Sequence, residues 1–240
     1  MENNFLQAEI FQRTKLLLGE EKFFKLQNST VAIFGIGGVG SFTAEALARS
    51  GVGHLILIDK DNIDITNINR QIHALTSTVG KSKVEVMRKR ILQINPAAEV
   101  ETIQKFFLSN EDAEDFFICD YDYVVDAIDT ISAKINLVCE CQKRGIKIIS
   151  SMGAGNKFDP AKFKVADIFK TSTDPVAKVL RKKFKELGIK NLKVVWSDEV
   201  PKKIDTKNFS EKIIGSVAFV PSVAGLILAS EVVKDLIENF

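Results

Sequence analysis

The stretch from Val31 to Gly40, which reads VAIFGIGGVG, constrains the fold of this chain most strongly. Four apolar residues run directly into a glycine-rich segment, and a helical pattern follows over 41–50. An unbroken apolar run is typical of a strand buried on both faces of a parallel sheet. Glycines allow a tight turn and let the backbone approach a phosphate, which the first N–H groups of the next helix then bind. The stretch therefore predicts a strand, a phosphate-binding loop and a helix.

The residues HLILID that follow predict a second strand, over 54–59, which ends in Asp59. Gly35, Gly37 and Gly40 have the G-x-G-x-x-G spacing, and Asp59 lies 19 residues after Gly40. A carboxylate at this place accepts hydrogen bonds from a ribose whose phosphates lie on the glycine loop. The pattern alone is typical of NAD or FAD sites, but it also occurs in other nucleotide sites.

The rest of the chain alternates between apolar runs and helical patterns. This predicts an α/β fold, a Rossmann-like, doubly wound and mostly parallel sheet with helices on both faces and a C-terminal elaboration. We expect a helical lead over 2–27, helices over 84–94, 106–118 (short), 132–144 and 176–193, strands over 99–104, 123–130, 147–153 and 194–197, a polar loop over 198–212, and a final strand and buried helix within 216–237. One domain then contains a lead (1–28), a nucleotide-binding half (29–153) and a C-terminal half with a basic segment (154–240).

The composition excludes secreted and membrane classes. With 45% hydrophobic and 27% charged residues, the chain reads as a soluble globular protein. The N-terminus lacks the pattern of a signal peptide. The longest apolar stretch, 213–233, is interrupted by Pro221, so a buried helix is expected there rather than a membrane span. We therefore predict a cytoplasmic protein with no membrane partner.

The cysteines and histidines do not form a recognisable metal motif. Three cysteines fit a reducing compartment better than a disulfide framework. Cys139 and Cys141 lie two residues apart on a predicted helix, so they face different directions and cannot chelate together. We therefore expect no zinc, a core position for Cys139, no evident role for Cys119, and a packing or capping role for His73.

The segment after the second strand, DKDNIDITNINRQIHALTSTVGKSK, is unusual for a dehydrogenase. It contains three acids and then several amide and basic side chains: Asp59, Asp61, Asp64, Asn67, Asn69, Arg70, Gln71, Lys81 and Lys83. Arginine and lysine neutralise phosphate charge, and carboxylates bind ribose hydroxyls and Mg²⁺. The segment thus suits a nucleoside triphosphate with a metal ion. The simpler interpretation is a polar loop before an amphipathic helix.

Two more acids, Asp126 and Asp129, end the fourth predicted strand. The carboxyl ends of parallel strands are where open α/β sheets bind ligands. Asp129 is therefore a candidate for Mg²⁺ or for the phosphate side of the site. Asp126 is either a ligand or a structural acid that caps the following turn, and the sequence leaves both open.

Positive charge gathers in the C-terminal half. Residues 157–193 hold eleven Lys or Arg against four acids, a net +7, so the remaining residues carry −5. The predicted helix there contributes Lys178, Arg181, Lys182, Lys183 and Lys185. Such a face can bind the phosphates of a nucleic acid, although an ordinary solvated helix has the same composition. Arg13, between two apolar groups in FQRTKLLLG, reads from spacing alone as a solvated surface arginine.

The elements GIGGVG, NINRQ, GKSK and DAID, in this order, resemble the adenylating superfamily of ubiquitin-activating enzymes and the bacterial ThiF and MoeB proteins. Three runs, NRQIHALTSTVGKSKVEVMRKRILQINP, SMGAGNKFDP and VADIFKTS, resemble the branch that dehydrates threonylcarbamoyladenosine in tRNA. The resemblance covers nearly the whole chain. It implies one ThiF-type adenylating domain over 1–240.

This resemblance implies a homodimer that uses ATP and Mg²⁺ to adenylate the threonyl carboxylate of threonylcarbamoyladenosine and to cyclise it with loss of water. The implied nucleotide-binding residues are Gly35, Gly37, Gly38, Asp59, Asp61, Asn67, Arg70, Gln71, Lys83, Asp126 and Asp129. Within this set, Asp59 holds the ribose, Lys83 acts at the α-phosphate and Asp129 binds Mg²⁺. The implied catalytic residues are Arg13, Asn67, Arg70, Lys83 and Asp129, with Arg13 supplied to the partner's site.

Cysteine motifs of the wider superfamily that this sequence lacks indicate which reaction to expect. The chain has neither late CxxC pairs nor a cysteine after Cys141, which favours adenylation and direct attack over a thioester. A sulphur-relay partner linked to a cysteine desulphurase would find no evident acceptor here. The main competing hypothesis is an enzyme that activates the C-terminus of a ubiquitin-like sulphur carrier. A non-catalytic nucleotide-sensing scaffold and an NAD-dependent oxidoreductase are two weaker hypotheses.

Overall fold

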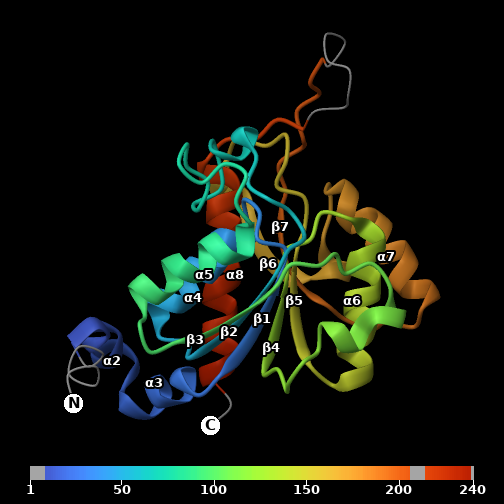
Figure 1. The fold of residues 1–240 in the computed structure, drawn as a ribbon. Helices are drawn as coiled ribbons and strands as arrows, with labels where there is room; N and C mark the ends of the chain where they lie inside the picture. The colour runs from blue at the N-terminus through green and yellow to red at the C-terminus, as the bar shows by residue number, and fades with distance from the viewer. Residues whose placement is uncertain (1–8, 206–213, 239–240) are drawn as a thin grey trace.

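The computed structural model describes residues 9–205 and 214–238. The first part of the predicted lead, residues 1–8, and part of the predicted polar loop, 206–213, lie outside the described residues. The described chain folds around a seven-stranded sheet with helices on both of its faces (Figure 1).

The sheet has the strand order β3-β2-β1-β4-β5-β7-β6. Its strands are β1 (Thr30–Phe34), β2 (His54–Ile58), β3 (Glu99–Ile103), β4 (Tyr123–Asp126), β5 (Lys147–Ser151), β6 (Phe163–Asp167) and β7 (Lys193–Ser197). Neighbouring strands are parallel except β6, which pairs antiparallel with β7. The predicted fold class, an α/β protein with a mostly parallel sheet, is confirmed.

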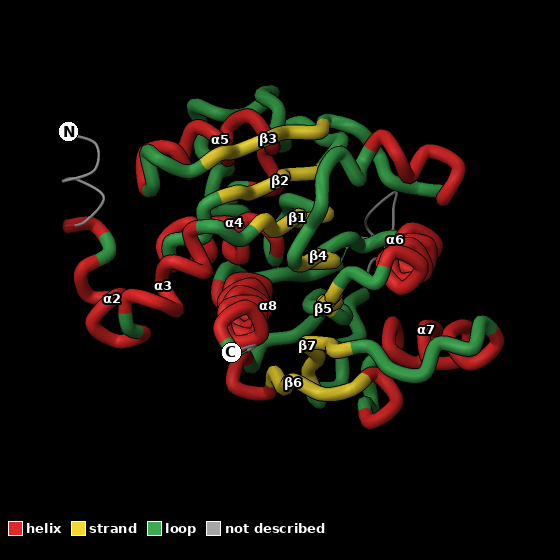
Figure 2. Tube along the Cα trace, turned by 90° about the horizontal axis from the view of Figure 1, so that it is seen from below, coloured by secondary structure: helices red, strands yellow, loops and turns green. Residues whose placement is uncertain are grey.

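The helices cover the sheet in two layers. They are α2 (Gln12–Leu18), α3 (Glu20–Gln27), α4 (Gly40–Ser50), α5 (Lys83–Ile94), α6 (Ile131–Arg144), α7 (Pro175–Glu186) and α8 (Phe219–Ile237), with short 3-10 turns η1 (Ile65–Asn67), η2 (Asn110–Asp115), η3 (Pro160–Lys162) and η4 (Ile168–Lys170). Seen along the sheet in Figure 2, α4 and α8 lie on one side, and α6 and α7 lie on the other.

Residue alternation in the strands explains these two layers. In β2, Leu55 and Leu57 join the core under α4, α5 and α8. Ile56 and Ile58 point the other way and join an aromatic cluster that includes Phe116. A strand with apolar residues at every position is buried on both faces, which is why the sequence reads as an unbroken apolar run.

The C-terminal segment departs from the prediction. The expected strand before Pro221 is wrong, since residues 214–218 within the described chain form no strand and α8 begins at Phe219. Pro221 lies in the first turn of α8, where a missing backbone N–H breaks no hydrogen bond within the helix. Helix α8 approaches α4 so closely that a Cβ on Gly225 would lie 2.3 Å from the Val39 carbonyl oxygen.

Three other boundaries differ from the prediction because of local geometry. The basic helix ends at Glu186 rather than at Lys193, since Gly188 has a φ of +73° and β7 starts at Lys193. The lead is two helices, because Gly19 at φ +85° separates α2 from α3. The predicted short helix over 106–118 is the 3-10 turn η2.

The helix α6 shows which of its cysteines is in the core. Cys141 is buried against the sheet, whereas Cys139 is only half-buried and faces α7, so the core position predicted for Cys139 is wrong. Two residues at this spacing lie about 200° apart around a helix, and only one of them can face the sheet. None of the described helices is long and apolar enough to cross a membrane.

The strand order places a crevice between β1 and β4. From β1 the chain winds outward through β2 to β3, and it then returns to form β4 on the other side of β1. The loops after β1 and β4 therefore leave in opposite directions, and a gap opens between them at the carboxyl edge. The glycine loop and the Asp126–Asp129 segment both lie at this edge.

Candidate nucleotide-binding site

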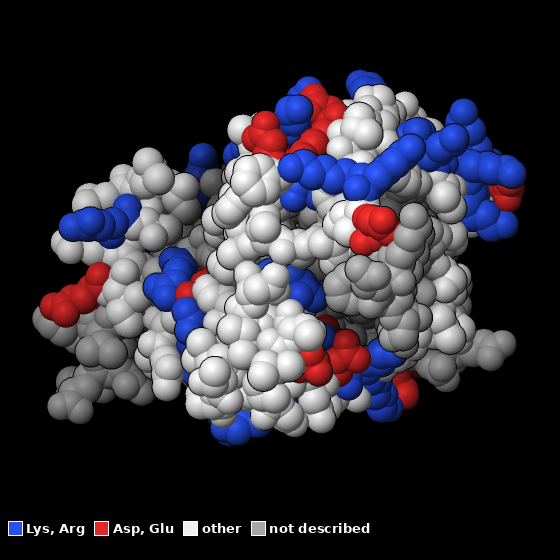
Figure 3. Space-filling model, turned by 90° about the horizontal axis from the view of Figure 1, so that it is seen from above, with Lys and Arg blue, Asp and Glu red and all other residues white. Residues whose placement is uncertain are grey.

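A pocket of 590 Å³ opens at the carboxyl edge of the sheet. Its lining comes mainly from the segments that follow β1 to β5, from the η1 region, and from residues of α5, α6, α7 and α8. Figure 3 views the molecule from above this edge and shows Lys and Arg side chains gathered over it. This is the position at which open α/β sheets bind their ligands.

The glycine loop packs tightly against neighbouring backbone at Gly35 and Gly40, whereas it is open toward the pocket at Gly37. A Cβ on Gly35, whose φ is +91°, would lie 2.7 Å from the Ala127 carbonyl oxygen, and one on Gly40 would lie 1.8 Å from the Gly35 oxygen. Both glycines are needed for the turn itself. A Cβ on Gly37, by contrast, would have its nearest neighbour at 3.9 Å, in the side chain of Gln71. The backbone at Gly37 therefore offers a surface that a phosphate can approach.

Asp59 joins the second strand to the glycine loop. Its carboxylate accepts the backbone N–H of Ile36 at 2.7 Å and that of Asp61 at 2.9 Å. These bonds fix the carboxylate in the pocket lining, beside the loop. This is the position predicted for a ribose-binding acid.

Lys83 is the first residue of α5 and is buried in the pocket lining. Its ammonium group lies 2.9 Å from Asp61 and 3.8 Å from Asp59. The lysine thus has anionic partners on the chain itself. A nucleotide phosphate in the pocket would compete with them.

The η1 turn and the residues directly after it supply two of the predicted site residues, Asn67 and Arg70. The Asp64 side chain caps this turn. The side-chain oxygen of Asn67 accepts the backbone N–H of Asp64 at 3.1 Å, so this oxygen already has a hydrogen-bond partner. Hydrogen bonds from Thr66 lower the pKa of Asp64. Arg70 donates to the Thr66 carbonyl at 2.8 Å and lines the pocket. Arg70 thus lies beside the glycine loop, where a Cβ on Gly38 would be 3.4 Å from the Arg70 Cγ.

Gln71 provides a direct sign that the pocket suits a polar ligand. Its side chain is 6% exposed and lines the pocket, yet its carbonyl oxygen has no hydrogen-bond partner among the described residues. A buried polar atom without a partner costs free energy, so such atoms usually meet a ligand or an ordered water. The atom without a partner is an acceptor, so it would meet a water or another donor and not a phosphate oxygen, and the predicted contact of Gln71 with a triphosphate stays a prediction.

Asp126 has a structural environment. It is fully buried and its carboxylate contacts Lys134 at 3.0 Å, Ser150 at 2.5 Å and the Ile128 N–H at 3.1 Å. Its bond to Ile128 caps the turn after β4, one of the two roles that the sequence left open. Asp126 does not appear in the pocket lining, whereas its partner Lys134 does.

Asp129 has an accessible carboxylate in the pocket lining. Its side chain is exposed in the pocket lining, and its one described bond is a long contact of 3.3 Å with Thr130. Mg²⁺ in phosphate sites is held by one or two carboxylates together with waters and substrate phosphates. A single accessible carboxylate facing the phosphate-binding loop fits such an ion.

Sequence reasoning missed Lys134 and a second buried ion pair in the pocket. Lys157 and Asp174 lie 2.8 Å apart with side chains 1% and 0% exposed, and both line the pocket. Asp174 also accepts the Ala177 N–H and caps α7. The Asp-Pro step that starts α7 could have revealed the cap, but not the pairing with a lysine seventeen residues earlier.

The structure does not bring Arg13 or the basic helix side chains into this pocket. Arg13 is an exposed residue of α2, which lies on the α3 side of the molecule, near the amino ends of the strands (Figure 1). In α7, Pro175 and Val176 line the pocket, and the helix runs outward from there. Lys178, Lys182 and Lys185 are exposed along it, while Arg181 contacts Thr171 and Lys183 pairs with Glu186.

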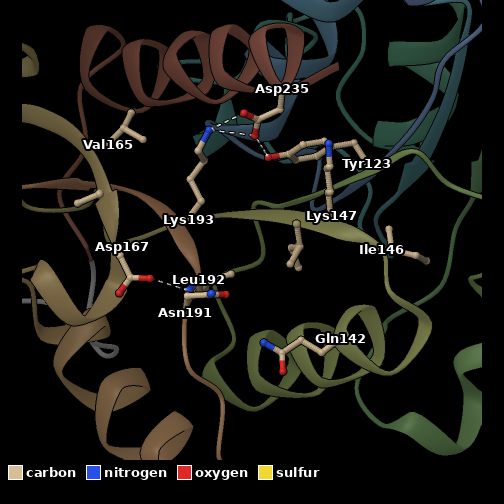
Figure 4. Close-up of a pocket in the computed structure, with 12 residues that line it drawn as sticks. Tyr123, Gln142, Ile146, Lys147, Val165, Asp167, Asn191, Leu192, Lys193 and Asp235 are labelled. Atoms are coloured by element: carbon tan, nitrogen blue, oxygen red, sulfur yellow. Dashed lines mark hydrogen bonds and ion pairs between the residues drawn. The ribbon is translucent and has the colours of Figure 1, made fainter. Parts of the chain in front are cut away.

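A second pocket, of 550 Å³, lies at the opposite edge of the sheet (Figure 4). Three of its polar side chains contact one another: Lys193 lies 2.8 Å from Asp235, and the Tyr123 hydroxyl donates to Asp235 at 2.6 Å. Burial and this carboxylate raise the pKa of Tyr123. We assign no ligand to this pocket.

Fold and pocket together define a nucleotide-binding protein of the Rossmann type. The chain belongs to the ThiF family, whose family model matches residues 11–239. This confirms the predicted membership in the adenylating superfamily.

Comparison with individual relatives distinguishes between the branches of this superfamily. The tRNA threonylcarbamoyladenosine dehydratase of Bacillus subtilis is 53% identical over 242 residues, which cover 95% of each chain. The solved structures of the Escherichia coli enzyme, TcdA, in complex with ATP and with AMP, match with a TM-score of 0.88 and 35% identity over 96% of this chain and 95% of that one. Ubiquitin-like modifier-activating enzyme 5 of Caenorhabditis elegans is 33% identical over 130 residues, 49% of this chain and 30% of that one. The tRNA-modifying branch is thus favoured over activators of ubiquitin-like sulphur carriers.

Proposed function

We propose that this chain is an ATP-dependent enzyme that adenylates the threonyl carboxylate of threonylcarbamoyladenosine in tRNA and closes it into a ring with net loss of water. The observation that carries the proposal is the pocket itself, in which Asp59, Arg70 and Lys83 surround an open glycine loop. The B. subtilis relative, which bears the name of a tRNA threonylcarbamoyladenosine dehydratase, supports the choice of substrate.

In this proposal, different pocket residues bind different parts of the nucleotide. Asp59 accepts the ribose hydroxyls, and the backbone at Gly37 and Gly38 faces the phosphates. Asn67, Arg70 and Gln71 contact the triphosphate. The unpartnered side-chain oxygen of Gln71 is an acceptor, so it would reach the phosphates through a bound water or a water on Mg²⁺. When ATP binds, the Lys83 ammonium group pairs with the α-phosphate in place of Asp61. Asp129 would hold Mg²⁺, which supplies charge neutralisation to the departing pyrophosphate.

The chemistry needs two displacements. A threonyl carboxylate oxygen forms a bond to the α-phosphorus while the bond to the β-phosphate oxygen breaks, and pyrophosphate leaves. An oxygen or nitrogen atom of the carbamoyl group in the same modification then forms a bond to the acyl carbon while the bond from that carbon to the AMP oxygen breaks. One N–H proton of the carbamoyl group is released, and AMP leaves with the former carboxylate oxygen. Lys83 and Arg70 stabilise the charge that develops at the α-phosphate. Ring closure is intramolecular and is favoured by proximity.

This route needs no covalent intermediate on the enzyme. No cysteine lines the pocket within the described part of the chain. Burial raises the pKa of both Cys139 and Cys141, so neither thiol is activated. A sulphur-relay partner linked to a cysteine desulphurase stays a prediction, without an acceptor residue to support it.

We propose that α7 binds the tRNA. Its amino end lies at the pocket, and its exposed Lys178, Lys182 and Lys185 follow one helix face away from it. Phosphates of the anticodon arm can contact this face while the modified base enters the pocket. A tRNA substrate would also set the place of action in the cytoplasm.

We further propose one adenylating domain over 1–240 that acts as a homodimer, with Arg13 supplied to the partner's pocket. Arg13 lies on α2, away from the pocket of its own chain. Its neighbours Leu16 and Leu17 are 81% and 84% exposed, and Phe24 on α3 is 67% exposed. Large exposed apolar side chains on adjacent helices are typical of a protein interface.

An isotope-exchange assay tests the proposal against its main competitor. With labelled pyrophosphate and ATP, we expect exchange that depends on tRNA carrying threonylcarbamoyladenosine and is absent with the same tRNA lacking the modification. Exchange that depends instead on a protein with a Gly-Gly C-terminus would support the sulphur-carrier hypothesis and overturn ours.

A further inference from the structure

Three side chains that can ligate a metal meet at the end of the sheet opposite to the nucleotide pocket. His54 begins β2, Glu101 lies on β3, and Cys119 lies in the loop between η2 and β4. One potential ligand atom from each, a ring nitrogen, a carboxylate oxygen and a thiol sulphur, lies within 4.8 Å of the other two. The cluster is independent of the proposed function and is not used by it.

The strand register explains why the first two side chains meet. β2 and β3 run parallel, with His54 opposite Glu99 and Ile56 opposite Glu101. His54 and Ile56 point to the same face of the sheet, and so do Glu101 and Ile103. Nε2 of His54 consequently lies 3.0 Å from the Glu101 carboxylate. The loop around Cys119 passes over this face and brings its sulphur to the pair.

A second contact orients the histidine for ligation. Nδ1 of His54 lies 3.3 Å from the hydroxyl of Thr30, which is its direct neighbour in the sheet. Metal-bound histidines commonly donate the other ring N–H to a neighbouring acceptor, and the Thr30 hydroxyl can accept such a bond from Nδ1 and so orient the ring. Nε2 is thereby left to face Glu101 and Cys119.

The local charge also favours a cation. The carboxylates of Glu101 and Asp120 lie near the Cys119 sulphur. The same negative charges attract a divalent ion, and a bound metal ion converts a thiol to the thiolate by displacing its proton to solvent.

We propose that His54, Glu101 and Cys119 bind one Zn²⁺ ion, with a water as the fourth ligand. Nitrogen, oxygen and sulphur donors are the zinc ligands found in proteins, at about 2.0–2.3 Å from the ion. Tetrahedral geometry then places the donor atoms about 3.3–3.7 Å apart, so the exposed Cys119 side chain needs to approach by about 1 Å. The sequence-based expectation of no zinc rested on the lack of a second cysteine pair and on the presence of only two histidines, and this proposal departs from it because the three donors come from separate segments.

Cobalt(II) as a spectroscopic probe tests the site. The full-length protein is reduced, treated with a chelator, and titrated with Co²⁺ at pH 7.5. We expect a thiolate-to-cobalt charge-transfer absorption that saturates at one ion per chain and is displaced by Zn²⁺. Cys119→Ser should abolish the absorption, and Cys139→Ser is the matched control that should retain it. Thr30→Val should weaken zinc binding about tenfold or more, because it removes the hydrogen bond that orients His54.

The outcomes separate the site from an ordinary surface ion pair. Absence of the absorption, or an identical absorption in Cys119→Ser, would overturn the proposal. So would zinc binding that is unaffected by His54→Gln in a variant whose circular dichroism matches that of the wild type. ATP binding should be the same with and without zinc, so failure here leaves the proposed function untouched.

Discussion

The ammonium group of Lys83 lies 2.9 Å from the carboxylate of Asp61, inside the pocket that surrounds the glycine loop. The backbone N–H of Lys83 also donates to the Asp61 carbonyl oxygen, at 3.1 Å. The first turn of α5 is thereby tied to the loop after β2. The buried cation keeps a partner before a nucleotide arrives, and it stands where a phosphate can replace that partner.

Replacing Lys83 should therefore stop the reaction without unfolding the protein. We expect Lys83→Ala to lower kcat for pyrophosphate release about 100-fold or more, as removal of a transition-state cation commonly does. Lys81→Ala is the matched control, because Lys81 is exposed in the same segment, outside the pocket lining. Equal activities of the two variants would contradict the assignment.

The two acids after β4 should differ in what their replacement affects. Asp126→Ala leaves the Lys134 ammonium buried without its partner, which should cost roughly 3–5 kcal/mol in the free energy of unfolding. Asp129→Ala removes an exposed carboxylate, so it should leave stability within about 0.5 kcal/mol of wild type and raise the Mg²⁺ concentration needed for activity. Urea unfolding measures the change in stability, and a titration of activity with Mg²⁺ measures the concentration of the ion that is needed. A stable Asp126→Ala protein would count against the structural role.

His73 should make stability depend on pH. Burial, followed by the charges of Lys83 and Arg90, lowers its pKa from 6.5 to about 4. Between these values the unfolded histidine binds more protons than the folded one, so the free energy of unfolding falls as the pH falls. Relative to His73→Gln, wild type should lose about 3 kcal/mol between pH 6.5 and pH 4. Chemical denaturation of both proteins at a series of pH values measures this, and a pH-independent difference would be inconsistent with a buried neutral histidine.

The exposed face of α7 should contribute to tRNA affinity through its interactions with phosphates. Changing Lys178, Lys182 and Lys185 to Gln should weaken tRNA binding and reduce the slope of log K against log salt by up to about 0.9 for each phosphate that is no longer neutralised. A control variant with Lys22, Lys89 and Lys143 changed to Gln has the same net charge, and all three are exposed elsewhere. If both variants shift the slope equally, α7 is an ordinary solvated helix.

Arg13 can be tested by mixing inactive variants. If Arg13 acts in the partner's site, Arg13→Ala and Lys83→Ala should each be inactive alone. Random reassociation of the two in equal amounts gives hybrid dimers with one intact site, and activity should return to about a quarter of wild type. If no activity returns after verified subunit exchange, Arg13 serves the site of its own chain, and if Arg13→Ala is active alone, Arg13 serves neither site.

The sequence was sufficient for the fold because each predicted strand carries its own signal. Val31–Phe34, Leu55–Ile58 and Val124–Val125 are buried apolar runs, and the glycines between them specify where the chain turns. The prediction failed where local preference and tertiary context disagree. The residues before Pro221 are β-branched and aromatic, yet packing of α8 against α4 recruits Phe219 and Val220 into a helix.

The candidate site was predictable where one segment supplies several groups, as the Asp59–Lys83 segment does. Pairings across the sheet were not. Nothing in the sequence connects Lys157 with Asp174 or Lys134 with Asp126, since each pair forms only after distant elements pack. The same reason hides the proximity of His54 to Cys119.

In the proposed reaction, the pocket uses ATP to remove water from a carboxylate in tRNA. Mass spectrometry of nucleosides from tRNA bearing threonylcarbamoyladenosine, after incubation with this protein, ATP and Mg²⁺, tests it most directly. We predict that the modified nucleoside loses the mass of one water only when ATP is present, with AMP and pyrophosphate formed in equal amounts. An unchanged nucleoside mass in the presence of ATP and active, folded protein would contradict the account.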